Sequence, residues 1–105
     1  MSVTTTDARK ILIPFDIREV LSVRAAAKIA GNSESTMRNW CEELGLGRRI
    51  GGKWAVSQVA LAMWLDADRK ALRAFHAGKR SDPIVISYFK RTGLGTLLAP
   101  AISTG

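Results

Sequence analysis

The sequence predicts a mainly α-helical fold that carries one short β-hairpin, and three observations support this prediction. Two short helical segments are joined by a three-residue turn that contains a glycine. Two neighbouring glycines then separate two short strand-like runs. A longer helical pattern follows them, with no proline or glycine before Gly78.

Serine caps and glycine stops define the first two helices. Ser22 precedes a helix expected over residues 23–30, which Gly31 ends. Ser33 caps a second helix of about three turns that ends at Gly45. Apolar spacing at i, i+3, i+4 and i+7 predicts a buried stripe of Met37, Trp40, Cys41 and Leu44. The opposite, exposed face then carries Glu34, Ser35, Arg38, Asn39 and Glu42.

A basic hairpin and a third helix follow. Residues 48–50 and 53–56 are predicted to pair around the two-residue turn Gly51–Gly52. Ser57 caps one long helix expected to run to about Ala77. A stripe of small and apolar residues on this helix has a spacing that favours close packing: Ala60, Trp64, Ala67, Ala71 and Ala74, with Leu72 and Phe75 beside them. The stripe could pack on residues 83–91 or on a second copy of the chain.

The remaining segments are less regular. Residues 11–20 are interpreted as an extended lead-in that lays Ile11, Ile13, Phe15 and Ile17 on the core, interrupted by Pro14. Asp82–Pro83 predicts a helix start that leads to Gly93, with a strand as the alternative because residues 84–86 are β-branched. The expected divisions are a flexible arm over 1–10, a principal domain over 11–66, a helical extension over 67–93 and an irregular tail over 94–105.

Composition indicates a globular protein that binds polyanions. Sixteen Lys and Arg against nine Asp and Glu give a net charge of +7. Nucleic acid is the first candidate for such a basic chain, and an anionic membrane is the second. Because no apolar run approaches about 20 residues and the first residues lack a secretory signal, we expect a cytoplasmic protein without a membrane partner.

The residues that carry chemistry favour neither an enzyme nor a metal site. Cys41 lies on the predicted buried stripe, and the single histidine, His76, is distant in sequence. One cysteine and one histidine cannot build a zinc site, and the glycines lack the spacing of a nucleotide-binding loop. We therefore expect no catalytic residue, no metal and no cofactor.

Residues 21–65 resemble the winged helix-turn-helix of MerR-type regulators, phage excisionases and some small terminase subunits. The resemblance is carried by Leu21–Ser22, Ala25–Ala26, Gly31, Ser33, Thr36, Arg38, Trp40, Gly51–Gly52, Trp54 and Ser57. Ala25 departs from the pattern, since many members have a glutamate there that completes a capping box. Asn32 also departs, because an apolar turn residue is usual.

The resemblance implies that the second helix enters the DNA major groove and that the hairpin, or wing, follows the phosphate backbone. It places DNA contacts of the second helix at Ser33, Ser35, Thr36, Arg38 and Asn39. Contacts of the wing fall at Arg48, Arg49 and Lys53, and Arg24 on the first helix would meet a phosphate. Trp40 and Trp54 are interpreted as core residues rather than base-stacking groups.

These observations favour a sequence-specific double-stranded DNA-binding protein of a bacterium or phage, which regulates transcription or bends DNA in the manner of an excisionase. A homodimer or cooperative oligomer on DNA, and a recombinase or other DNA-processing partner, are expected with that role. The alternatives are a small terminase-like subunit that assembles during DNA packaging, and a module that binds only proteins.

Overall fold

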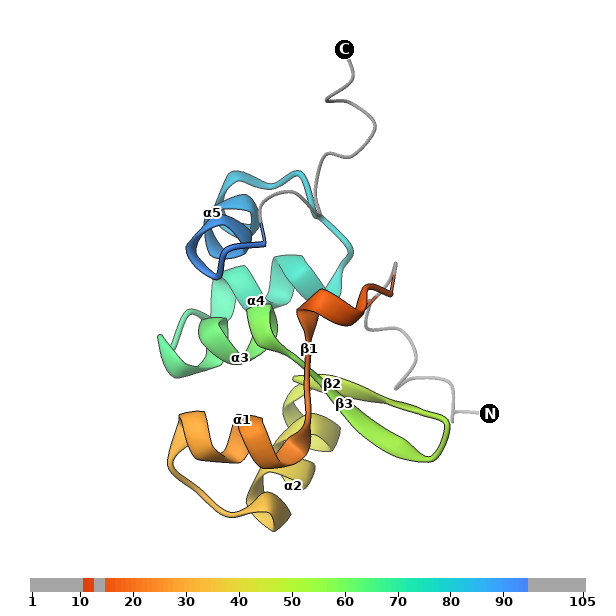
Figure 1. Ribbon diagram of the computed structural model, residues 1–105. Coiled ribbons are helices and arrows are strands. Elements are labelled where there is room, and N and C mark those ends of the chain that lie inside the picture. Colours follow the sequence, from red (N-terminus) through yellow and green to blue (C-terminus); the bar gives the residue numbers. More distant parts are fainter. Residues whose placement is uncertain (1–10, 13–14, 95–105) are drawn as a thin grey trace, which may run out of the picture.

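The described part of the chain is mainly helical, with a small antiparallel sheet. The computed structural model describes residues 11–12 and 15–94, so the predicted arm over 1–10 and nearly all of the predicted tail lie outside the described residues. The elements in order are the 3-10 helix η2 (Ile17–Glu19), β1 (Val20–Leu21), α1 (Val23–Ala30), α2 (Glu34–Leu44), β2 (Gly47–Ile50), β3 (Lys53–Ser57), α3 (Gln58–Leu65), α4 (Arg69–His76) and α5 (Pro83–Arg91). Helices α1 and α2 lie below the sheet in Figure 1, and helices α3, α4 and α5 lie above it.

The first two helices begin and end at the predicted residues. The Ser22 hydroxyl accepts a hydrogen bond from the Ala25 backbone N–H at 3.0 Å, and the Ser33 hydroxyl accepts one from the Thr36 N–H at 3.0 Å. Each bond satisfies a donor that the first turn of a helix leaves without an intrahelical partner. The stops at Gly31 and Gly45 are likewise confirmed.

The hairpin has the predicted turn and a close strand pairing. Gly51 and Gly52 both have positive φ, 60° and 82°, the backbone that a two-residue turn between antiparallel strands requires. A Cβ atom at Gly47 would collide with the backbone oxygen of Ala55 on the facing strand. The absence of a side chain at Gly47 therefore lets β2 approach β3 where the hairpin meets the core.

The lead-in contributes a third strand, which the sequence did not predict. Strand β1 pairs with β3, so the strand order is β1-β3-β2. Ile11 is buried as expected and Leu12 is buried as well, but Phe15 and Ile17 are 51% and 69% exposed. Placing those two side chains on the core was wrong, because η2 interrupts the alternation just before β1. Ile13 lies outside the described residues.

The prediction of one long third helix was also wrong. The chain turns at residues 66–68 between α3 and α4, where Ala67 has the left-handed φ of 59°. Asp68 starts the new helix, since its Oδ1 accepts the Ala71 N–H at 3.0 Å. The Tyr88 hydroxyl on α5 lies 2.9 Å from Asp66 Oδ2 and 3.0 Å from Asp68 Oδ2, and Arg91 forms an ion pair with Asp66. These contacts hold the turn against α5.

Because the helix is divided, only part of the predicted packing seam lies inside the molecule, since Ala67 is exposed at the turn and Trp64 and Ala74 are half-buried. Ala60 and Ala71 are fully buried, and Leu72 and Phe75 are buried with them. The Phe75 ring packs edge-to-face on Phe89 of α5, with centroids 5.8 Å apart. The intramolecular alternative, in which residues 83–91 cover these side chains, is therefore confirmed, and that segment is the predicted helix rather than a strand.

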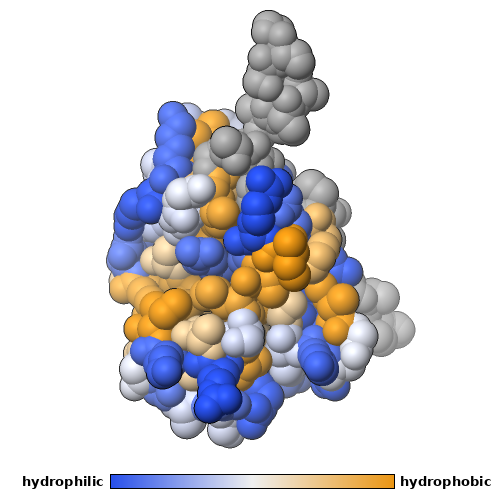
Figure 2. All heavy atoms as spheres, viewed as in Figure 1, coloured by the Kyte–Doolittle hydropathy of each residue, from blue (hydrophilic) through white to orange (hydrophobic). Residues whose placement is uncertain are grey.

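Side chains from the predicted principal domain (11–66) and from the predicted helical extension (67–93) lie in one apolar cluster. It joins Met37 and Cys41 of α2 to Phe75 of α4 and Phe89 of α5. Exposed apolar side chains remain, among them Ile29 on α1 and Leu65 on α3. In this view apolar surface crosses the molecule over α1 and α3 as a band between hydrophilic regions (Figure 2). In the part of the chain that the structure describes, no helix is long and apolar enough to cross a membrane.

A buried polar contact closes the core. The fully buried Glu19 carboxylate accepts hydrogen bonds from the Ser57 hydroxyl at 2.7 Å and from Arg80 Nη2 at 3.3 Å. The Arg80 guanidinium lies over the rings of Phe75 and Phe89, 5.6 and 4.8 Å from their centroids. Burial raises the pKa of Glu19 above its ordinary value of 4.5, and the bonds from Ser57 and Arg80 offset only part of that effect.

The turn between α3 and α4 leads to a prediction about stability. Replacing Ala67 by glycine removes the steric strain of a left-handed alanine, so Ala67→Gly should raise the free energy of unfolding by about 0.5 to 1 kcal/mol. Ala77 is the matched control, because it is exposed but has an ordinary φ of −81°. Urea denaturation should show a gain for Ala67→Gly and none for Ala77→Gly. Equal effects at the two positions would contradict the left-handed turn.

The buried carboxylate leads to a prediction about pH. A raised pKa in the folded state means that the folded protein binds the Glu19 proton more tightly than the unfolded chain, so the contribution of Glu19 to stability falls as pH rises. The free energy of unfolding of the unmodified protein, minus that of Glu19→Gln, should be constant below pH 4.5 and should decrease above it until Glu19 is ionised. Denaturation at a series of pH values measures this difference. A difference that grows with pH would show that Glu19 is stabilised in its charged form.

Candidate nucleic-acid interface

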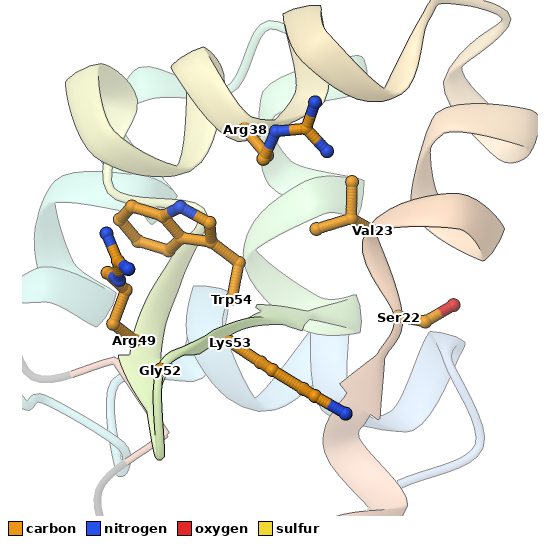
Figure 3. A pocket seen from close by; sticks show the side chains of 7 residues that line it. All are labelled: Ser22, Val23, Arg38, Arg49, Gly52, Lys53 and Trp54. Atoms are coloured by element: carbon orange, nitrogen blue, oxygen red, sulfur yellow. The ribbon is translucent and has the colours of Figure 1, made fainter.

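Basic side chains from α2 and from the hairpin meet at a surface pocket. The pocket has a volume of about 410 Å³ and lies between the start of α1, the exposed face of α2 and the β2–β3 hairpin. Figure 3 shows its lining, which consists of Ser22, Val23, Arg38, Arg49, Gly52, Lys53 and Trp54. No carboxylate is among these lining residues.

Strand register determines which hairpin cations face this pocket. Arg49 pairs with Trp54 across the hairpin, so the two side chains share one face of the ribbon. The Arg49 guanidinium lies 5.7 Å from the centre of the Trp54 ring, within the range of a cation–π contact. Arg48, one residue earlier, projects from the opposite face, and its Nη1 donates a hydrogen bond to the Leu12 carbonyl at 3.3 Å. The two wing arginines therefore have different surroundings.

The predicted contact residues of α2 fall into two groups. Ser35, Arg38 and Asn39 are exposed, and Arg38 lies 4.0 Å from Glu34 one turn earlier, a contact of little energy at an exposed site. Ser33 and Thr36 instead bond to each other, because the Ser33 hydroxyl donates to Thr36 Oγ1 at 3.0 Å while it caps the helix. Ser33 and Thr36 thus hold the start of α2, and the other three side chains are presented to solvent.

The last two predicted cations extend the basic surface. Lys53 lines the pocket, but its side chain points away from Trp54 and toward the segment that carries Ser22 (Figure 3). Arg24 is exposed on α1 but does not line the pocket. Arg38, Arg49 and Lys53 therefore all line the pocket, with their side chains pointing in different directions (Figure 3), whereas Arg24 and Arg48 do not line it.

Four lining residues were not among the predicted site residues: Ser22, Val23, Gly52 and Trp54. Trp54 is half-buried and packs against the core, as predicted, but it also forms a wall of the pocket. A two-residue turn at Gly51–Gly52 fixes the pairing of Arg49 with Trp54, so the sequence held the signal for that contact. Trp40 is half-buried as well and packs edge-to-face on Trp64 with centroids 5.9 Å apart, which confirms its core assignment.

The other reactive groups are buried or bonded to the backbone. Cys41 is buried, and burial raises the pKa of its thiol to about 11, which leaves very little thiolate at neutral pH. His76 contacts the backbone, with Nε2 2.9 Å from the Gly45 carbonyl oxygen. Among the described residues, no group of three metal-ligating side chains could hold an ion. A pocket of three cations, one hydroxyl and one indole is suited to an anion that carries a flat or apolar group.

No protein-family model, curated protein or solved structure matches the chain.

Proposed function

We propose that this chain is a winged helix-turn-helix protein that binds double-stranded DNA in a sequence-specific manner through α2 and the β2–β3 hairpin. The observation that carries the proposal is that Arg38 of α2 and Arg49 and Lys53 of the hairpin line one pocket whose lining holds no carboxylate. A cationic surface beside an exposed helix is suited to bind the phosphate groups of DNA.

The exposed face of α2 supplies the groups that read bases. A major groove admits one α-helix, and arginine and asparagine pair with guanine and adenine edges through two hydrogen bonds each. Arg38 and Asn39 are exposed on that face, one residue apart, with Ser35 beside them. The pairing of Arg38 with Glu34 is long, at 4.0 Å, so DNA can replace it at little cost.

The hairpin and the helix starts supply the groups that position the duplex. Arg49 and Lys53 would bind phosphates beside the groove, and Arg24 would bind one from α1. The capped starts of α1 and α2 leave further backbone N–H groups that can donate to phosphate oxygens. Ser33 and Thr36 act indirectly in this proposal, because their hydroxyls stabilise the start of α2.

The same proposal gives the protein a role without catalysis. It would regulate transcription, or bend DNA in the manner of an excisionase, in the cytoplasm of a bacterium or an infected cell. The likeness of residues 21–65 to MerR-type regulators and excisionases supports this choice. A packaging subunit would use one long third helix and the apolar tail for oligomerisation; α3 and α4 are separate helices, and nearly all of the tail lies outside the described residues. Self-association on DNA stays a prediction, because the described residues supply no exposed packing seam for it. A recombinase partner also stays a prediction.

Base reading by Arg38 gives the first test of this proposal. Selection of bound genomic fragments, followed by footprinting, should yield a defined site with the unmodified protein. Arg38→Ala should then lose the preference at one base pair, with a discrimination of about 1 to 3 kcal/mol removed. Glu34→Gln is the control, because it frees Arg38 from its ion pair and should keep the preference. Uniform weakening on all sequences would make Arg38 a phosphate contact instead.

The two faces of the hairpin give a second test. Arg49→Gln should reduce the magnitude of the slope of log affinity against log salt by about 0.9, the value for one lost phosphate contact. Arg48→Gln is a control with the same change of charge and should alter the slope by less than half as much, because Arg48 faces Leu12. Affinities for one duplex at several salt concentrations measure both slopes. Equal losses would contradict the assignment of Arg49 alone to the DNA side.

A further inference from the structure

The exposed face of α4 carries only cations. Arg69, Lys70 and Arg73 are exposed and lie within an arc of about 100° of the helix, while Ala71, Leu72 and Phe75 are buried on the other face. None of the three cations forms an ion pair with a described residue. We call Arg69, Lys70 and Arg73 the α4 basic face.

The nearby carboxylates are committed to other groups. Asp66 is paired with Arg91 and accepts from the Tyr88 hydroxyl. Asp68 caps α4 through Oδ1, and its Oδ2 lies 3.0 Å from the same hydroxyl. Neither of these two carboxylates forms an ion pair with the α4 basic face.

Local helix energetics disfavour this arrangement. Arg69 and Lys70 lie in the first turn of α4, which contains no acidic residue. Cations are unfavourable at the positive end of a helix dipole, and Arg69 and Arg73 also repel each other at i,i+4 spacing. A helix face that serves only solubility usually mixes both signs of charge, so these three cations point to an anionic partner.

We propose that the α4 basic face is a second DNA-binding surface, which takes the phosphate backbone of a duplex without reading its bases. Protein partners usually meet apolar and aromatic side chains at the centre of an interface. The exposed large apolar residues of the described chain are Phe15, Ile17, Ile29, Ile50 and Leu65, and none of them lies on α4. A purely cationic surface matches a regular row of phosphates better than it matches a protein.

This surface is separate from the pocket but rigidly joined to it. In Figure 1, α4 lies with α3 and α5 in the upper half of the molecule, whereas α2 and the hairpin lie in the lower half. The contact between His76 and the Gly45 carbonyl ties the end of α4 to the end of α2. The protein would therefore hold DNA at two sites whose relative position is set by the fold.

Salt-dependent binding to a random-sequence 30-base-pair duplex tests this proposal. Fluorescence anisotropy from 50 to 200 mM salt gives the slope of log affinity against log salt concentration. For Arg69→Gln/Arg73→Gln this slope should be smaller in magnitude than for the unmodified protein by about 1.8, the value for two lost phosphate contacts. Lys28→Gln/Lys90→Gln removes the same charge from exposed lysines on α1 and α5 and should change the slope by less than about 0.5. Arg69→Lys/Arg73→Lys keeps both charges and should retain the original slope.

Other outcomes overturn the proposal in distinguishable ways. Equal slopes for the two glutamine variants would mean that net charge alone acts. Loss of binding to immobilised polyglutamate by Arg69→Gln/Arg73→Gln, with duplex binding unchanged, would identify an acidic protein as the occupant. If Arg49→Gln weakens duplex binding while Arg69→Gln/Arg73→Gln does not, only the second surface is excluded. Absence of duplex binding by the unmodified protein would reject both DNA surfaces.

Discussion

The buried carboxylate of Glu19 is the interaction on which the arrangement of the other parts depends. Its two oxygens join the end of η2 to Ser57, at the end of β3, and to Arg80, in the loop before α5. Ser57 also caps α3 by accepting the Ala60 N–H at 3.1 Å, so one hydroxyl ends the hairpin and starts the next helix. Removing one partner of such a buried pair leaves an uncompensated charge, which typically costs about 3 to 5 kcal/mol. The direction of the hairpin, and with it the position of Arg49 beside α2, therefore follows from a contact made outside the pocket.

Local signals were sufficient for the parts of the fold that local contacts determine. The serines at 22, 33 and 57 each cap a helix, because a cap needs only a donor three residues away. The turn at Gly51–Gly52 depends on two adjacent residues in the same way. The break between α3 and α4 had a local signal of the same kind, since Asp68 caps α4 through the Ala71 N–H three residues later. The contacts that hold Asp66, from Tyr88 and Arg91, come from 22 and 25 residues further along the chain and could not be predicted by these means. The pairing of β1 with β3 is a similar long-range effect.

The candidate site shows the same division between local and long-range information. Arg38, Arg49 and Lys53 were predicted as site residues and line the pocket. Helix period determines the face of Arg38, and hairpin alternation places Arg49 on the face of Trp54, whereas Lys53, paired with Ile50, starts from the opposite face of the ribbon. Assigning Arg48 to the same surface as Arg49 neglected that alternation, which places neighbouring strand residues on opposite faces. The place of Trp54 in the pocket wall depends on how the hairpin meets α1 and α2. Burial of this kind is a property of the assembled fold and could not be predicted from its residues.

The basic character of the surface results from where the acidic residues lie. Asp16 pairs with Arg18, Glu19 with Arg80 and Asp66 with Arg91. Asp68 and Asp82 bond to the backbone N–H groups of Ala71 and Ile84, at the starts of α4 and α5. These carboxylates fix turns and helix ends, so they do not compensate the charge on the hairpin and the outer face of α4. Helix α2 differs, because it carries exposed carboxylates of its own at Glu34, Glu42 and Glu43. Cations of the net +7 chain therefore gather without carboxylates beside them on the hairpin, at Arg48, Arg49 and Lys53, and on the α4 basic face. The contacts that stabilise the structure and the surfaces proposed to bind DNA thus have a common origin.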